Sequence, residues 1–393
     1  MIQQPLYIAL ILLTVVIGAN SWAHRFEHSK LMRVLPTPVW CYVPPTILTT
    51  CGILPYQSPV YDWISRYVLP ACLILLLMTT DMGGLKRIGR TALIAMLGAA
   101  VTVICGGIMV FFLFQKELGP EGWKMIGTLT ASWVGGTANE LAVKEATGLS
   151  DMAFGPLFIA DITIVYVWMT FLMILSGNQT KIDRLLHANR KSLELIMHHS
   201  QKETQTREKA QSITTQSLIL CLIIGFGMGC VATWLGTQIP EIGLAINRAT
   251  WIVILVTTAG LLLAFTSSAQ SNGGTATKVG YFLLYFVLAS TGAKANLLVI
   301  VKAPLFLGIA FIWMLIHGVL YFGFGRLFRM PIAILAAASQ AALGGVVSAP
   351  IVASTYQREL VSVALILAIL GNAVGNYAGI LTAQLARVLA GLY

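Results

Sequence analysis

Charged residues are scarce in this chain of 393 residues. Asp, Glu, Lys and Arg together make up 10% of it, whereas hydrophobic residues make up 57% and the mean hydropathy is +0.81. Apolar runs of about 18–25 residues recur along the chain, which is the length needed to cross a bilayer core of ~30 Å. Alternating segments of about ten residues, which a membrane β-barrel requires, are absent. These features predict a polytopic, all-α membrane protein.

Sequence motifs of enzymes and of ATP-driven pumps are also missing. The chain contains no GxxxxGK(S/T) phosphate loop, no HExxH or GxSxG motif, and no pair of intramembrane aspartates. Its six cysteines form no CxxC pair, so neither a metal site nor a disulfide framework is visible. We therefore expect no catalytic residues, no metal and no cofactor other than a coupling ion. The formal charge of +10 resides in short loops and one linker, as topology signals do, and does not indicate a nucleic-acid partner.

The apolar segments form two groups of six around one polar linker, residues 177–213. They lie at residues 5–23, 37–54, 66–81, 91–115, 124–147 and 152–176, and then at 214–236, 248–268, 279–291, 303–325, 331–354 and 359–391. Segment 5–23 has the length of a signal peptide, but no basic residue precedes it and basic residues follow it. We therefore expect an uncleaved first span whose N-terminus lies outside.

The two groups of segments resemble each other in sequence. LLLMTTDMGGLKR at 75–87 aligns with FVLASTGAKANLL at 286–298, an offset of 211 residues, and the glycine pairs at 135–136 and 344–345 align at an offset of 209. Two further matches fall in the last segment of each group: Asp161 with Asn372, and Tyr166 with Tyr377. Weak identity at a nearly constant offset is typical of an internal structural repeat. We expect a first repeat at 1–176 and a second at 214–393.

The distribution of basic residues indicates how these repeats lie in the membrane. If every segment crossed, the basic loops at 24–33 and 82–90 would lie opposite the linker, against the positive-inside rule. If segments 124–147 and 331–354 instead enter the membrane and turn back, the loops and the linker share the cytoplasmic side. An odd number of crossings per half also makes the repeats inverted. We therefore predict, for each repeat, about five transmembrane helices plus a re-entrant Gly-Gly hairpin or broken helix. The protein would lie in the cell (inner/plasma) membrane with both termini outside.

Two motifs resemble a known family. WVGGTAN at 133–139 and FGPLFIADITIVYVWM at 154–169 are similar to the membrane-protein family known as domain of unknown function 819, and the likeness covers essentially the whole chain. That family is grouped with the cation:proton antiporter/anion transporter superfamily, which includes bile-acid, glutamate and hydroxycarboxylate sodium symporters. The resemblance implies inverted repeats, a mobile transport unit with broken helices, and a more static scaffold unit through which a homodimer could form. The second tip, GGVVSA, departs from the hydroxycarboxylate pattern because it is apolar.

Asp161 is the most informative single residue. It lies about nine residues into the apolar run 152–176, near mid-membrane if that run is helical, and an acidic side chain at that depth indicates function by default. Its carboxylate could ligate Na⁺ or carry a proton. The alternative is a neutral Asp161 that bonds to the hairpin backbone and holds the broken helix in place.

Polar side chains follow the first glycine pair. Thr137 and Asn139 offer oxygen ligands for an ion, and half-helix ends beside them supply partial charges that hold cations or anionic substrate groups. A purely structural turn is the alternative. Glu140 stands four residues before Lys144, so Glu140 is either a substrate contact or part of a solvated or paired helical arm. The glycines themselves permit a tight turn and let a ligand approach the main chain, so we place Gly135, Gly136, Gly344 and Gly345 at the substrate site.

The last segment contains glycine and asparagine at helical spacing. Its glycines at 371, 375 and 379 permit very close contact with another helix, and we expect that helix to belong to the re-entrant hairpin. Asn372 and Asn376 lie one turn apart on an adjoining stripe. Asn372 suits ion binding and Asn376 suits substrate binding, with interhelical hydrogen bonding as the alternative. Gln340 and Ser348 flank the second tip and complete a polar cavity, and His317 is expected to be a satisfied core histidine.

Taken together, these features favour a secondary active transporter. Interrupted helices and a few matched intramembrane polar residues describe alternating access around a midplane site. The cargo would be a small organic anion or amino-acid-like solute, coupled to Na⁺ or H⁺, and the lipid bilayer would be the other partner. An ion channel or exchanger on the same scaffold is the main alternative. An intramembrane enzyme is the weaker one, because catalytic motifs are missing.

Overall fold

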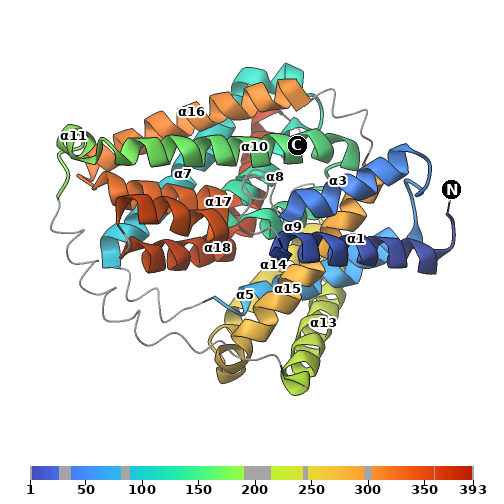
Figure 1. Cartoon of the computed structure of the whole chain (residues 1–393). Coiled ribbons are helices and arrows are strands. Elements are labelled where there is room, and N and C mark those ends of the chain that lie inside the picture. The colour runs from blue at the N-terminus through green and yellow to red at the C-terminus, as the bar shows by residue number, and fades with distance from the viewer. Residues whose placement is uncertain are drawn as a thin grey trace. The chain divides into compact units, whose positions relative to one another are not determined.

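The computed structural model describes residues 2–25, 37–80, 89–189, 214–241, 247–295, 303–357 and 359–391, and these contain helices and no strand. The first half forms α1 (Pro5–Arg25), α3 (Thr37–Thr50), α4 (Pro59–Trp63), a π-helical turn η1 (Ile64–Val68), α5 (Leu69–Leu77), α7 (Gly89–Leu118), α8 (Gly122–Gly135), α9 (Thr137–Thr147), α10 (Asp151–Ser176) and α11 (Gln179–Leu185). The second half forms α13 (Thr215–Gln238), α14 (Arg248–Leu263), α15 (Ser267–Lys294), α16 (Ala303–Leu327), α17 (Ile332–Tyr356) and α18 (Leu360–Leu389) (Figure 1). The predicted linker beyond residue 189 and most of the basic loops at 24–33 and 82–90 lie outside the described residues.

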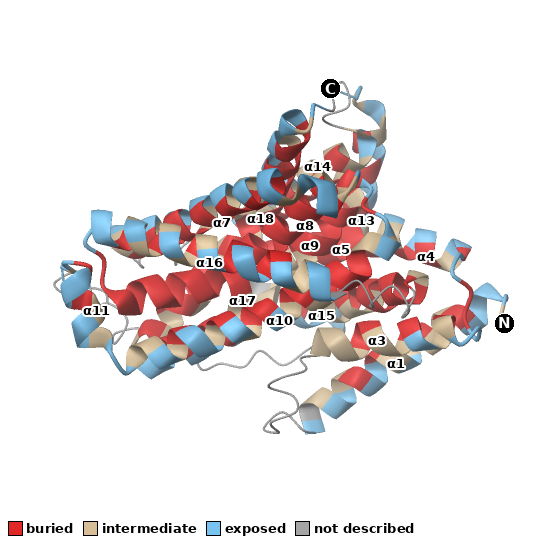
Figure 2. Ribbon diagram, turned by 90° about the horizontal axis from the view of Figure 1, so that it is seen from above, coloured by how far each residue is buried: buried red, intermediate tan, exposed pale blue. Residues whose placement is uncertain are grey.

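Eight helical stretches of the described chain are long and apolar enough to cross a membrane. They are Pro5–Ala23, Pro59–Leu77, Gly89–Leu118, Asp151–Ser176, Thr215–Gln238, Pro304–Leu327, Ile332–Tyr356 and Leu360–Leu389. Large apolar side chains on them stay exposed, for example Phe112 at 75% and Val319 at 74%, and such residues are suited to lipid. Figure 2 colours the exposed positions along the helices pale blue. The prediction of a multi-pass helical membrane protein is confirmed. The inverted orientation of its halves stays a prediction.

Two predicted segments have wrong boundaries. Segment 279–291 is part of the much longer helix α15, whose first turns are rich in Ser, Gly and Thr and therefore give no hydropathy signal. Segment 66–81 begins too late, because the helical stretch already starts at Pro59. There Ser58 accepts a hydrogen bond from the backbone N–H of Val60 at 3.3 Å, an N-cap followed by proline at the first helical position.

The chain forms two compact units. Unit 1 comprises residues 1–79, 148–159 and 211–306, and unit 2 comprises residues 80–147, 160–210 and 307–393. Helix α10 therefore begins in unit 1 and continues in unit 2. Each unit collects segments from both halves of the sequence. The two compact units therefore do not coincide with the predicted sequence repeats at 1–176 and 214–393. The boundaries of those repeats stay a prediction.

Unit 1 contains a close crossing of α3 and α15. The hydroxyl groups of Thr46 and Thr49 donate hydrogen bonds to the carbonyl oxygens of Gly292 at 2.9 Å and Ala293 at 2.8 Å. A β-carbon at Gly292 would overlap the carbonyl oxygen of Tyr42, so only glycine permits this approach. Small and hydroxyl residues thus hold the two backbones together, as is common where helices pack in a membrane.

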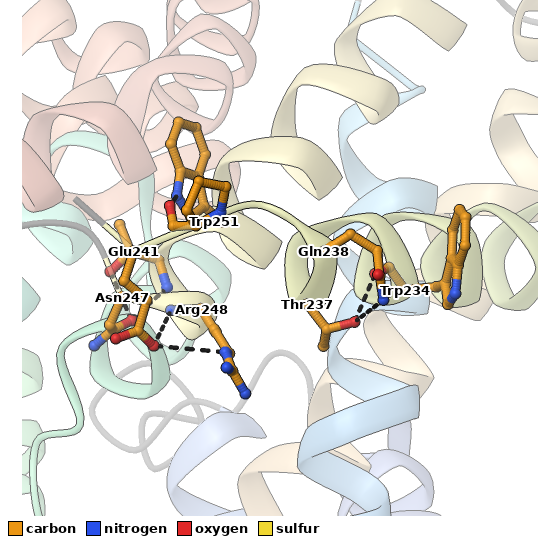
Figure 3. Close-up of polar contacts among 9 residues, drawn as sticks. Trp234, Thr237, Gln238, Glu241, Asn247, Arg248 and Trp251 are labelled. Carbon is orange, nitrogen blue, oxygen red and sulfur yellow. Dashed lines mark hydrogen bonds and ion pairs between the residues drawn. The ribbon is translucent and has the colours of Figure 1, made fainter.

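Polar side chains lie at the end of α13 and at the start of α14 in unit 1 (Figure 3). Asn247 accepts a hydrogen bond from the backbone N–H of Thr250 at 2.8 Å and so begins α14. The indole N–H of Trp251 donates to the carbonyl oxygen of Pro240 at 3.2 Å, and Arg248 lies 3.7 Å from the carboxylate of Glu241. Both side chains of that ion pair are at least half exposed, so we assign it little stability.

Helix α18 carries the glycine stripe of unit 2, and helix α8 packs directly on it. A β-carbon at Gly375 would lie 2.6 Å from the Cα of Gly135, and one at Gly379 would lie 2.6 Å from the Cβ of Ala131. Gly135, near the end of α8, lies beside Gly375, whereas the earlier residue Ala131 lies beside the later residue Gly379. The two helices are therefore antiparallel. This contact confirms the expectation that the glycine stripe meets the hairpin.

Helix α9 contacts the same stretch of α18 in the opposite order. A β-carbon at Gly375 would lie 2.9 Å from the Cγ of Asn139, and one at Gly379 would lie 3.0 Å from Cγ2 of Val143. The chain therefore runs from the level of Gly379 to that of Gly375 along α8, reverses at Gly136, and runs back. The arms of 14 and 11 residues are about 21 and 16 Å long, so each is shorter than a bilayer core of ~30 Å. The first interruption is a hairpin and not a broken spanning rod.

Helix α17 is interrupted at the matching place. Gly345 has φ 63° and ψ −156°, and Gly136 has φ 80° and ψ −179°, a region essentially restricted to glycine. The first glycine of each pair makes room for a side chain four residues later. A β-carbon at Gly135 would overlap Nδ2 of Asn139, and one at Gly344 would overlap Oγ of Ser348. The two interruptions share this local geometry, and the repeat itself stays a prediction.

Candidate functional site

The first hairpin holds Asp161 of α10 by two side-chain hydrogen bonds. The hydroxyl of Ser132 donates to Oδ2 at 2.7 Å, and the indole Nε1–H of Trp133 donates to Oδ1 at 2.6 Å. Asp161 is 4% exposed, so both of its oxygens are buried and both are satisfied. The bonds come from side chains of α8 and not from the hairpin backbone. Two donors and no acceptor around the carboxylate suit its ionised form.

Ser132 and Trp133 are functional candidates that sequence reasoning missed. They stand in the stretch ASWVGG, one turn before the glycine tip, where a hydroxyl and an indole N–H would otherwise have no partner at membrane depth. The sequence signal was that two hydrogen-bond donors and a single carboxylate all stand in apolar segments, where each needs a partner. Residues 28 and 29 positions apart meet there because both side chains of the hairpin arm reach the carboxylate on α10.

The tip of the first hairpin is built by Gly136 and Asn139. The side-chain amide of Asn139 donates to the carbonyl oxygen of Gly135 at 2.6 Å. This hydrogen bond joins the end of α8 to the first turn of α9. Its Oδ1 is buried and accepts no hydrogen bond from the described residues. A β-carbon at Gly136 would lie 3.7 Å from Oδ1 of Asn372 on α18. The structure therefore brings Asn139 and Asn372 to the same tip, while Thr137 begins α9 and is half-buried.

Glu140 is fully buried, so the solvated-arm interpretation is wrong. It is 0% exposed, and within the described part of the chain neither of its oxygens has a hydrogen-bond partner. The expected i,i+4 pair does not form, because the ammonium of Lys144 lies 3.1 Å from the carboxylate of Glu145 instead. Glu140 does lie within electrostatic range of Asp161. Two buried carboxylates thus share the region around the first tip.

The second tip is closed by its own side chains. The amide of Gln340 donates to the hydroxyl of Ser348 at 2.8 Å. Both residues are buried, and Oε1 of Gln340 accepts no hydrogen bond from the described residues. Gly344 and Gly345 are half-buried beside them. The second tip therefore presents amide and hydroxyl groups without a carboxylate, which makes the two tips chemically unequal.

Asn376 and His317 are also buried in unit 2. Asn376 lies on α18 and is 0% exposed. His317 on α16 has both ring nitrogens engaged, with Nδ1 3.0 Å from the hydroxyl of Thr102 and Nε2 3.1 Å from that of Ser339. Trp168 on α10 donates to the same Ser339 hydroxyl at 2.9 Å. His317 is therefore the satisfied core histidine that the sequence predicted, and it joins α7, α10, α16 and α17.

The chemistry of the site suits small, hard ions better than transition metals. The described residues contain no group of three or more His, Cys, Asp and Glu side chains placed to hold a metal, and none of the six cysteines forms a disulfide. What the first tip offers is carboxylate and amide oxygen. Oxygen ligands of this kind accept protons or bind hard cations.

The first hairpin reverses beside the middle of α18, a helix long and apolar enough to cross a membrane, and two buried carboxylates lie in the same unit. Together with the other apolar helices, these features define a multi-pass helical membrane protein with interrupted helices. The chain belongs to the family described as "Protein of unknown function (DUF819)", whose sequence profile matches residues 11–389. It is 25% identical over 346 residues to a protein of Bacillus subtilis (strain 168) described as "Uncharacterized membrane protein YjcL", and the match covers 85% of each chain. The family expected from the two sequence motifs is confirmed.

Proposed function

We propose that this protein is a secondary active transporter that moves a small organic anion or amino-acid-like solute across the cell membrane, coupled to Na⁺ or H⁺. The observation that carries the proposal is the first hairpin. Its two arms lie along one stretch of α18 and bury Asp161 and Glu140 near the turn. Interrupted backbone and buried charge at membrane depth are both unfavourable, and transporters use them together at midplane binding sites.

Unit 2 is assigned the transport role, because it contains both glycine interruptions and all the polar residues of the candidate site. Asp161, Asn139, Thr137 and Asn372 supply oxygens for the coupling ion. The cargo is held by the glycine tips and by Glu140, Gln340, Ser348 and Asn376. Unit 1 is then the scaffold and the surface for a homodimer. The sequence resemblance implies a relation to the superfamily of cation:proton antiporters and anion transporters. Its members have inverted repeats and alternating access, and a division into a transport unit and a scaffold unit fits that pattern.

The function is tested first by binding. Purified protein in detergent is heated across a panel of metabolites, with Na⁺ and pH varied independently. A ligand that binds only the folded protein raises the unfolding midpoint by mass action, and a coupled ion makes that rise depend on Na⁺ or pH. Organic anions and amino acids are expected to give the largest rises.

Proteoliposomes then separate a transporter from a channel. A transporter saturates with substrate and shows ion-coupled exchange of the labelled solute, whereas a channel passes ions at high rates without exchange. Uncoupled, non-saturating ion flux that needs no solute would contradict the proposal. So would the absence of any ion-dependent uptake for every ligand that stabilises the protein.

A further inference from the structure

Glu140 and Asp161 are both buried in unit 2, but their surroundings differ. Asp161 receives one hydrogen bond on each oxygen, from Ser132 and Trp133. Glu140 is completely buried, and no described residue donates a hydrogen bond to either of its oxygens. The surroundings of Asp161 therefore stabilise a negative charge by hydrogen bonds, whereas those of Glu140 do not.

No basic side chain of the described residues forms an ion pair with Glu140. Lys144, on the same helix, is engaged with Glu145. The helices that pack most closely on α9 are α8 and α18, and their basic residues are Lys124, 3.3 Å from Glu121, and Arg387, which lies over the ring of Trp123. Each lies 12 residues along its helix from the level of the tip, at Gly136 on α8 and Gly375 on α18, which is about 18 Å at 1.5 Å per residue.

The Asp161 carboxylate lies close enough to repel a negative charge on Glu140. Ionised Glu140 would thus be desolvated, without hydrogen bonds and repelled by a second anion, which is the least favourable arrangement for a buried charge. A metal cation could relieve this only with several converging oxygens, whereas a proton needs a single oxygen and no cavity. The described residues contain no group of three or more His, Cys, Asp and Glu side chains that could hold a metal ion.

We propose that Glu140 is the proton carrier of this protein, and that Asp161 is the fixed anion that positions the hairpin. A proton from water adds to one carboxylate oxygen of Glu140 and gives the neutral acid, which can be buried. The same proton returns to water when the tip is exposed, and the carboxylate is restored. This inference rests on the proposed transport function and assigns H⁺ as its coupling ion. It replaces the role of Glu140 as a cargo contact by that of proton carrier, and the role of Asp161 as an ion ligand by that of a fixed anion.

Infrared spectroscopy of the full-length protein in lipid tests this assignment, because a protonated carboxyl group has a carbonyl stretching band that a carboxylate lacks. The band is expected at neutral pH in the wild-type protein, to be missing in Glu140→Gln, and to persist in Glu145→Gln and Asp161→Asn. Glu145 is the matched control, since it lies on the same helix but is a third exposed and ion-paired. Loss of the band in Asp161→Asn with retention in Glu140→Gln would overturn the proposal. So would a wild-type spectrum that lacks the band and changes only when Na⁺ is added.

A second measurement uses stability and does not require Glu140→Gln to be fully active. If folded protein holds a proton on Glu140 that the unfolded chain releases, stability falls as pH rises through the neutral range. The unfolding midpoint of wild type and of Glu145→Gln is expected to fall with pH, and that of Glu140→Gln to fall less. Identical pH dependence in all three would contradict the proposal. Neither measurement needs a substrate, so a negative transport assay would refute the function while leaving the proton on Glu140 standing.

Discussion

Gly135 at the end of α8 and Gly375 in α18 face each other so closely that a β-carbon on Gly375 would lie 2.6 Å from the Cα of Gly135. The Cα and the N of Gly135 are backbone atoms, which cannot move aside as a side chain would. Asn139 of the second arm lies beside the same glycine, so both arms of the first hairpin meet α18 here.

Gly375→Ala is expected to destabilise the protein by about 1–3 kcal/mol, because the added methyl group overpacks a backbone contact. It should also reduce ligand binding, since α9 shifts with the hairpin. Thermal unfolding in detergent measures the first effect and the metabolite panel the second. Gly323→Ala in α16 is the control, as nothing lies within 4 Å of its added β-carbon. Equal stability of the two variants would show that the hairpin does not depend on this approach.

Asp161→Asn and Asp161→Ala should differ in stability. Asparagine can still accept from Trp133 through its oxygen and donate to the Ser132 hydroxyl, so the fold is kept. Alanine leaves two buried donors without a partner, and we expect a loss of about 1–3 kcal/mol for each. Thermal unfolding of the two variants beside wild type measures this difference, and equal midpoints would contradict it.

If Asp161 binds the coupling ion, Asp161→Asn should abolish any Na⁺ or pH dependence of ligand stabilisation. If Glu140 carries the proton, the pH dependence should persist in this variant. The check is the midpoint shift with ligand, measured against Na⁺ and pH in wild type and in this variant. Unchanged dependence in a folded Asp161→Asn protein would reduce Asp161 to a structural residue.

Gly136→Ala and Gly345→Ala should each lose about 1–3 kcal/mol, because both glycines occupy a backbone region that other residues avoid. If the two tips serve unequal roles, only Gly136→Ala should also weaken the proton-dependent behaviour. Paired unfolding and infrared measurements of the two variants test this. A larger effect on the carboxyl band from Gly345→Ala would contradict the unequal roles of the tips.

Ser339→Ala should destabilise unit 2 by about 1–3 kcal/mol, because it leaves the indole N–H of Trp168 and one nitrogen of His317 unsatisfied. Ser354→Ala is the control, since its exposed hydroxyl bonds to the carbonyl oxygen of Ile351 within the same helix. Unfolding midpoints distinguish the two. Transport coupling should be unaffected by Ser339→Ala at temperatures where the protein is folded, and its loss there would show that His317 belongs to the ion path.

Several features were accessible to sequence reasoning because they are local. The apolar runs record which stretches fit a bilayer, and the glycine pairs at 135–136 and 344–345 mark the two places where helix geometry ends. The four-residue spacing of glycines 371, 375 and 379 predicted a close helix contact, and the contact with α8 is there. The boundary errors at α15 and at Pro59 have one cause, since hydropathy does not register polar helical turns.

From its amino-acid order alone, this chain is a many-spanning helical protein with two glycine interruptions and one conspicuous aspartate in an apolar run. Which carboxylate is satisfied and which is not becomes visible only in three dimensions. The side chains of Ser132 and Trp133 on the hairpin reach Asp161 on α10, and Glu140 is fully buried without a hydrogen-bond donor among the described residues. Solvation of a charge depends on neighbours from the whole fold, and spacing along one segment does not contain that information.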